Sequence, residues 1–275
     1  MKIIEQFIQS KTGNMETCED SIFANEHFIC IIDGATSKTD KRWNGLTPGQ
    51  VAKNLIMDSI EYINRTSSAE KFFLSINEAI KQWYQKEKIT IEMEQHITQR
   101  CTASVVVYST HRKQIWIVGS GIAIIGDQYI NATIPSDLLA SHLRSYYIQT
   151  ELRRGVTEYE LMETDTSREF ILPVLKRQVQ FQNSQLPSEF DYYAIDGFYK
   201  PPRGIQIFDI PEDTESIVMA SDGYPEVYKT LEQSEKYLAQ LLKEDPLLYK
   251  KHKALKGLRR GFVSFDDRSY VKVAL

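Results

Sequence analysis

The sequence lacks several features that would place it in a special class of protein. Its longest nearly uncharged run, Ile115–Gly126, is too short to span a bilayer and is interrupted by three glycines, so we expect no transmembrane helix. The N-terminal stretch Met1–Lys11 mixes charged with apolar side chains and has no apolar signal core. Three cysteines leave one over in any disulfide pairing and have no close metal-ligand spacing. We therefore expect a cytoplasmic protein that does not contact a membrane.

Excess positive charge, linkers and repeats are also missing. The net charge of −4 argues against general polyanion binding, so we expect no nucleic-acid partner. One segment, Tyr249–Gly261, is strongly basic and could contact acidic partners or nucleic acid, but a solvated helix end is the simpler interpretation. The five histidines fit no ligand spacing, and we assign none of them to a metal. With 275 residues and an apolar share of 42%, the chain can form a sizeable core, and we predict one domain over residues 1–275.

The apolar patterns predict an α+β protein. Strand patterns cover residues 2–10 and 20–33, and the second of these contains a hairpin with Ala24–His27 as its connection. Amphipathic helices are predicted from Gln50 and from Ser67 or Ser68, and an antiparallel meander follows from Thr102. Further elements are predicted at 136–154 and 170–179 (helices), 204–210 and 216–221 (strands), 230–242 (helix) and 269–275 (strand). The hairpin-type spacing favours two packed antiparallel sheets, a β-sandwich, with helices outside.

Three apolar strands end or begin at an aspartate. Asp33 follows "FICII", Asp222 follows "SIVMAS", and Asp266 precedes the last strand. A single Asp-Gly pair is weak because it is also a favoured hairpin turn. Three such carboxylates from distant parts of the chain could converge at one sheet edge, and hard divalent cations prefer oxygen ligands of this kind. Glu19 and Asp20 add two acidic residues at the start of the strand that pairs with the one ending in Asp33.

Taken in order, these motifs resemble the metal-dependent serine/threonine phosphatases of the protein phosphatase 2C type. Glu19 and Asp20 fall on the family's early Glu-Asp pair, and "IIDG" falls on its central Asp-Gly. "CTASVVV" and "IWIVGSG" resemble its two middle strands. "MASDGYPEVY" resembles its Ser-Asp-Gly motif, and "FDDRSYVKVAL" its closing strand. The resemblance covers some 250 residues and implies a four-layer αββα arrangement, with a variable helical or flap segment around 136–203.

The resemblance also implies a chemistry. Asp33, Asp222 and Asp266 would be the catalytic residues of a phosphoric monoester hydrolase that acts on phosphoserine and phosphothreonine in proteins through a metal-activated water. Asp33 would bridge two ions, Mn²⁺ or Mg²⁺, with Gly34 and a water-mediated Glu19 completing one site, and Asp222 and Asp266 completing the other. We expect a monomer whose partner is a phosphorylated protein. The expected metal-binding set is Glu19, Asp20, Asp33, Gly34, Asp222 and Asp266.

Several positions depart from the family pattern. Met15 stands where eukaryotic members carry a phosphate-binding arginine, and Lys11 is a nearby candidate for that role. Ser120 replaces an aspartate, and the loop Ala35–Lys38 replaces a glycine pair. Lys38 and Arg42 are the predicted phosphate-binding residues, with Lys41 as a further candidate; a solvated loop is the alternative.

Two other functions remain open from the sequence. The departures would also suit a catalytically weak or inactive relative that serves as a binding or regulatory module. An unrelated small-molecule phosphohydrolase with the same metal centre is a third possibility, because substrate recognition lies in loops.

Overall fold

Two five-stranded antiparallel sheets form the centre of the molecule. The structure is a computed structural model and describes residues 2–275. The first sheet has the strand order β1-β10-β9-β6-β7 and the second the order β2-β3-β4-β5-β8. The strands of the first sheet are β1 (Lys2–Gln9), β10 (Arg268–Ala274), β9 (Ser216–Ala220), β6 (Gly121–Ile125) and β7 (Gln128–Ala132). Those of the second are β2 (Asp20–Ala24), β3 (Phe28–Gly34), β4 (Ala103–Ser109), β5 (Gln114–Val118) and β8 (Gln206–Asp209).

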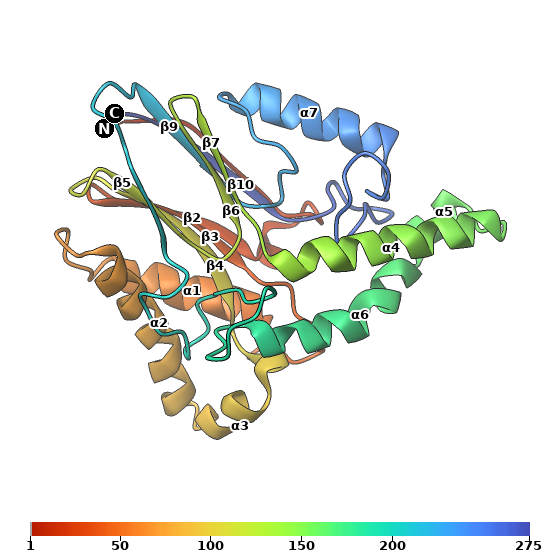
Figure 1. Cartoon of the computed structure of the whole chain (residues 1–275), viewed down its shortest axis with the longest axis horizontal. Helices are drawn as coiled ribbons and strands as arrows, with labels where there is room; N and C mark the ends of the chain where they lie inside the picture. The colour runs from red at the N-terminus through yellow and green to blue at the C-terminus, as the bar shows by residue number, and fades with distance from the viewer. Residues whose placement is uncertain (1) are drawn as a thin grey trace.

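Helices cover both outer faces of this sandwich (Figure 1). The helices are α1 (Pro48–Ile60), α2 (Ala69–Lys86), α3 (Thr90–Gln95), α4 (Pro135–Arg153), α5 (Glu158–Glu163), α6 (Thr166–Gln178) and α7 (Leu231–Glu244). Three short 3-10 helices are η1 (Met15–Thr17), η2 (Ile97–Gln99) and η3 (Val179–Phe181). No helix among residues 2–275 combines the length and the apolar character that a membrane span requires.

Three apolar clusters hold the layers together. One lies between the sheets and includes Ile31, Val106 and Met219. A second packs α1 and α2 on the second sheet, and a third packs α7 on the first sheet. The order helix, sheet, sheet, helix confirms the predicted four-layer αββα arrangement.

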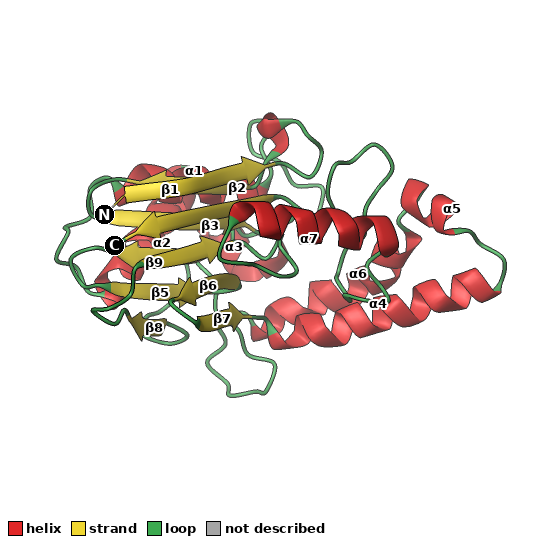
Figure 2. Cartoon of the chain, turned by 90° about the horizontal axis from the view of Figure 1, so that it is seen from above, coloured by secondary structure: helices red, strands yellow, loops and turns green. Residues whose placement is uncertain are grey.

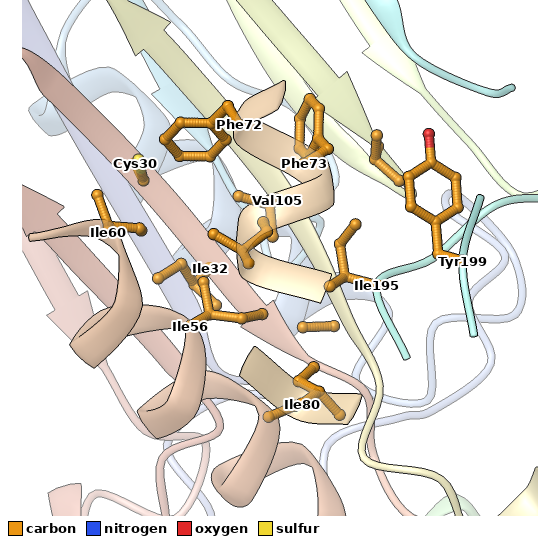
Figure 3. Close-up of a cluster of buried hydrophobic side chains, with 14 of the residues drawn as sticks. Cys30, Ile32, Ile56, Ile60, Phe72, Phe73, Ile80, Val105, Ile195 and Tyr199 are labelled. Atoms are coloured by element: carbon orange, nitrogen blue, oxygen red, sulfur yellow. The ribbon is translucent and has the colours of Figure 1, made fainter. Parts of the chain in front are cut away.

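The cluster under α1 and α2 includes Phe72, Phe73 and Tyr199 (Figure 3). Phe28, Phe72 and Trp116 are fully buried, and their rings pack against one another at centroid distances of 4.9 to 6.3 Å. Each buried side chain of this size contributes about 2–3 kcal/mol relative to an exposed one. This cluster therefore anchors the second sheet, and with it the strand that ends in Asp33.

Local signals set the helix boundaries. Thr47 caps α1 through a reciprocal capping box with Gln50, and Pro48 occupies the first helical position, so α1 begins two residues before the predicted start. Ser68 caps α2, which decides between the two predicted caps. The hairpin of β2 and β3 is confirmed, with Asp20 paired in register with Asp33.

The predicted meander is wrong in one respect. β4 and β5 pair in the second sheet, but the chain then crosses to the first sheet, where β6 pairs with β7 and β9. The crossing occurs at Gly119, whose φ is +90° and where a Cβ would lie 2.2 Å from the Ser104 hydroxyl oxygen. Only glycine fits this turn, because both its backbone conformation and its surroundings exclude a side chain.

The segment between β7 and β8 is mainly helical. α4, α5 and α6 extend past the ends of the strands, while the two chain termini lie at the opposite end of the sandwich (Figures 1 and 2). Helix α5 is an element that the sequence patterns did not predict. The start of α4 and one face of α6 border the end of the sheets where β3 and β9 finish.

Candidate active site

The three predicted aspartates come together at one end of the sandwich. Asp33 is the second-last residue of β3 in the second sheet, Asp222 follows β9 in the first sheet, and Asp266 precedes β10. All three line one cavity of about 430 Å³. Strands from both sheets therefore deliver carboxylates to the same space, although the residues are separated by up to 233 positions in the sequence.

The glycines that follow two of these aspartates are required by packing. Neither Gly34 nor Gly223 has a positive φ, so neither Asp-Gly pair is the hairpin turn that the sequence left as an alternative. A Cβ on Gly34 would lie 2.4 Å from the Gly49 carbonyl oxygen, and one on Gly223 would lie 1.8 Å from the Asp267 carbonyl oxygen. These glycines let neighbouring backbones approach closely, and this brings the aspartates to the cavity.

Asp33 and Asp222 form a pair of neighbouring carboxyl groups. Burial raises the pKa of Asp33 well above its usual value, and the nearby charges of Asp20, Asp222 and Asp266 raise it further. The Asp222 carboxyl group lies within hydrogen-bonding reach of Asp33. Across residues 2–275, no lysine or arginine forms an ion pair with either group. No lysine or arginine of this range therefore compensates the negative charge that the pair carries when it is ionised.

Asp20 and Glu19 lie behind the cavity wall rather than on it. Asp20 is 1% exposed and accepts a hydrogen bond of 2.7 Å from the Ser269 hydroxyl. Burial raises the pKa of Asp20 to about 7, although hydrogen bonds from Ser221 and Ser269 oppose this rise. Glu19 is held by the Thr47 hydroxyl at 2.7 Å and the Thr36 hydroxyl at 3.1 Å. Gly34 is buried as well and does not line the cavity.

Asp266 differs from the other two aspartates because two lysines neutralise it. Lys11 Nζ lies 3.2 Å from Asp266 Oδ1, and Lys256 Nζ contacts Asp266 Oδ2. Burial alone would raise the pKa of Asp266, but Lys256 and Lys11 outweigh burial and hold this pKa well below its usual value. Lys11, the candidate for a phosphate-binding role, is thus already engaged by carboxylates.

Of the two predicted phosphate-binding residues, only Lys38 reaches the cavity. Lys38 lines it and makes no hydrogen bond or ion pair with any other residue of the range 2–275. Burial, together with the nearby cations Arg168 and Lys256, lowers the pKa of Lys38 to about 8. Arg42 is exposed and donates a hydrogen bond of 2.8 Å to the Lys41 carbonyl, while Lys41 pairs with Glu92 at 2.9 Å.

Three further cations at the cavity, Arg168, Lys253 and Lys256, were missed by sequence reasoning. Arg168 of α6 lines the cavity and donates a hydrogen bond of 3.1 Å to the Leu255 carbonyl. Lys256 comes from the basic segment that was interpreted as a solvated helix end; α7 in fact ends at Glu244, and the segment loops back to the site. The only sequence feature that pointed to Lys256 was the density of lysines in that segment, and no sequence feature pointed to Arg168.

Met15 and Ser120, two positions that depart from the family pattern, differ in whether they reach the cavity. Met15 is 47% exposed and does not line the cavity. Ser120 does line it, and its hydroxyl lies 3.2 Å from that of Ser104. His252 also borders the cavity, and burial lowers its pKa.

The residues fit one divalent cation better than two. Within the described range 2–275, no group of three or more His, Cys, Asp and Glu side chains is arranged to hold a metal ion. Magnesium, however, is often held by only one or two carboxylates and takes its other ligands from water or substrate. The uncompensated pair Asp33 and Asp222 fits that pattern. Asp266 does not fit it, because two ammonium groups already neutralise its carboxylate.

No protein-family model and no curated protein matches the sequence. Solved structures similar to the chain include the serine/threonine phosphatase PstP/Ppp of Mycobacterium tuberculosis, at 13% identity over 100% of this chain and 99% of that chain, with a TM-score of 0.49. Serine/threonine phosphatase Stp1 from Staphylococcus aureus has 15% identity, coverage of 100% and 96%, and a TM-score of 0.49. RsbX in complex with magnesium has 12% identity, coverage of 98% and 97%, and a TM-score of 0.45. Solved serine/threonine phosphatases are thus among the structures that the chain is similar to, and its sequence motifs resemble the same class of enzyme.

Proposed function

We propose that the chain is a metal-dependent phosphomonoesterase that hydrolyses phosphoserine and phosphothreonine in proteins, with Mn²⁺ or Mg²⁺ as its cofactor. The observation that supports this most directly is the composition of the cavity. Uncompensated carboxylates, Asp33 and Asp222, face the same space as the unpaired cation Lys38. A phosphate ester with a bound divalent cation requires both kinds of group, because the cation needs oxygen ligands and the phosphoryl oxygens need positive charge.

The proposed roles follow from position. Asp33 and Asp222 would hold the cation; the resemblance implies the Gly34 carbonyl as a further ligand, although Gly34 does not line the cavity. When bound, such a cation supplies Lewis acidity, which lowers the pKa of water and neutralises charge on the phosphoryl oxygens. Lys38 and Arg168, which line the same cavity, would bind and orient the phosphoryl group. Asp20 would position Asp33 from behind, through the β2–β3 register.

The cavity also supports the proposal that the chain forms a single domain. The cavity draws residues from β3, β4, β6, β7, α4 and α6 and from the loops after β9 and before β10, so the proposed site needs segments from most of the chain. We propose that residues 1–275 act as one catalytic domain and that the segment around 136–203 shapes access to the cavity. The expected partner is a phosphorylated protein bound by a monomer.

One observation favours a second function. Lys11 and Lys256 neutralise Asp266, which the resemblance would make a metal ligand. A chain with this change could bind a phosphorylated partner through Lys38 and Arg168 without hydrolysing it. The same assay separates the two functions, because a binding module gives phosphopeptide affinity without phosphate release.

The deciding measurement is phosphate release from a phosphothreonine peptide, with excess chelator and with added Mn²⁺, Mg²⁺ or Ca²⁺. We expect no release in chelator and more with Mn²⁺ than with Ca²⁺, whose larger radius and looser geometry suit the site poorly. The matched variants are K38M and R42M. Because only Lys38 faces the cavity, K38M should lower kcat/KM about tenfold or more, while R42M should stay near wild type. Undiminished release in chelator, or equal kinetics for the two variants, would contradict the proposed site.

A further inference from the structure

Two lysine ammonium groups lie inside the carboxylate cluster next to the cavity. Lys11 Nζ is within 3.2 Å of Asp266 Oδ1, 3.3 Å of Glu19 Oε2 and 3.5 Å of Asp267 Oδ2. An ammonium group has three hydrogen-bond donors, and here three separate carboxylates surround it. Lys11 therefore occupies the kind of position that a cation takes among oxygen ligands.

Lys256 completes the neutralisation from another part of the chain. Its Nζ contacts Asp266 Oδ2 and donates a hydrogen bond of 2.8 Å to the Thr36 hydroxyl. Thr36 in turn donates a hydrogen bond of 3.1 Å to Glu19 Oε2. Lysines from the loop after β1 and the loop after α7 are thus joined by one hydroxyl into a closed network around Asp266 and Glu19.

The backbone of Lys11 is fixed as well as its side chain. Asp267 Oδ1 accepts a hydrogen bond of 2.8 Å from the Lys11 amide, and Asp267 Oδ2 accepts one of 2.7 Å from the Glu19 amide. Asp267 is 3% exposed, so these bonds are shielded from water. The contact between Lys11 and its carboxylates is therefore part of the packed structure and does not depend on a free surface side chain.

A divalent cation at Asp266 would have to compete with both ammonium groups. Each oxygen of Asp266 has its own lysine partner, and an added ion of the same sign would be repelled by both nitrogens at close range. Asp33 and Asp222 have no such partner among residues 2–275. Positive charge from a diffusible ion is therefore needed at one half of the cluster only.

We infer that Lys11 and Lys256 take the place of a second metal ion, so that the centre binds a single divalent cation at Asp33 and Asp222. This inference rests on the proposed function, in which those two aspartates hold a cation. It differs from the two-ion centre that the sequence resemblance implies. Lys11 and Lys256 are then positioning residues: they hold Asp266 and Glu19 in place and supply fixed positive charge beside the ion.

The number of Mn²⁺ ions per chain tests the inference without reference to activity. Titration of free Mn²⁺, followed by its electron paramagnetic resonance signal, should give one ion for the wild type. The double variant K11M/K256M keeps the apolar stems and removes both charges, and it should bind two ions. The control K229M removes an exposed lysine that pairs with Asp127 at the β6–β7 turn, and it should still bind one.

A second variant covers the case in which K11M/K256M does not fold. If Asp266 is neutralised by lysine and binds no ion, D266N should still bind one Mn²⁺, whereas D33N should bind none. Two ions on the wild type would overturn the inference and leave the proposed metal-dependent hydrolysis intact. Loss of the single ion in D266N would also overturn it. Absence of any Mn²⁺ binding by the wild type would remove the proposed function itself.

Discussion

At the scale of single residues, the buried Asp20 makes the stability of the protein depend on pH. Its carboxyl group is buried behind Asp33, and burial raises its pKa to about 7. The unfolded chain has an ordinary aspartate pKa near ~4. A raised pKa in the folded state means that this group favours folding only when protonated, so its contribution is complete below the unfolded pKa and is lost as the pH rises toward about 7.

The variant D20N should remove this part of the pH dependence. In chelator, the free energy of unfolding of the wild type should fall between about pH 4 and pH 7, by an amount on the order of 1.4 kcal/mol per unit of pKa difference. D20N keeps the shape and can still accept the Ser269 hydrogen bond, so its stability should fall less over the same range. Urea unfolding at pH 4.5, 5.5 and 7.5 measures the difference. Parallel pH profiles for the two proteins would show that Asp20 is not buried as described.

The sequence predicted the aspartates of the site and Lys38, but not Lys256. Asp33, Asp222 and Asp266 each adjoin an apolar strand, and strand ends are predictable because burial fixes the pattern of the strand. Lys256 lies in a loop whose path depends on contacts with α4, about 100 residues earlier in the chain. A local pattern contains no information on such a contact, so Lys256 was interpreted as surface charge.

At the scale of secondary-structure elements, the loop after α7 depends on one buried arginine of α4. Arg144 is fully buried, and its Nη1 donates hydrogen bonds to the carbonyls of Leu247 at 2.8 Å and Ala254 at 3.2 Å. Asp245 holds the same loop through the amides of Lys250 and Lys251, both at 2.8 Å. These contacts set the direction in which the loop carries Lys256 to Asp266.

Replacing Arg144 should therefore loosen this loop and destabilise the protein. R144M leaves two buried carbonyls without a donor, and we expect a loss of about 2–4 kcal/mol in the free energy of unfolding. Amide hydrogen exchange in residues 247–256 should become faster than the loss of global stability explains. Exchange in β3 and β4 should change only as much as the global free energy of unfolding changes. The matched control is R154M, because Arg154 is exposed and pairs only with Glu151, so its loss should be within about 0.5 kcal/mol. Unchanged exchange in R144M would show that Asp245 alone holds the loop.

The assignment of strands to sheets was the least predictable part of the fold. β5 and β6 are buried on both faces over almost their whole length, so their side chains show no alternation that would indicate which sheet each strand joins. The crossing between the sheets is set by the close approach of Gly119 to Ser104, a tertiary contact. By contrast, the capped and amphipathic helices α1 and α2 were predictable because their signals are local.

At the scale of the whole molecule, the sandwich forces like charges together. Asp33 is in a strand of one sheet and Asp222 follows a strand of the other, so packing the two sheets brings their carboxyl groups together. The two groups repel each other when both are ionised and no cation is present. That repulsion opposes folding, and a bound divalent cation would convert it into attraction. The stability of the entire sandwich should then depend on the metal concentration.

Thermal melts of D222N test this coupling. In chelator, D222N should be as stable as the wild type or more so, because one repulsive charge is removed while the shape is kept. Mn²⁺ at about 100 times its dissociation constant should stabilise the wild type by ~2.7 kcal/mol, which corresponds to a rise in Tm on the order of 5–10 °C. D222N should show a much smaller rise, because it loses one of the two proposed ligands. The control D213N changes an exposed aspartate between β8 and β9 and should keep the full rise. An equal rise in D222N and the wild type would contradict the assignment of Asp222, since a turn aspartate would lower stability regardless of metal.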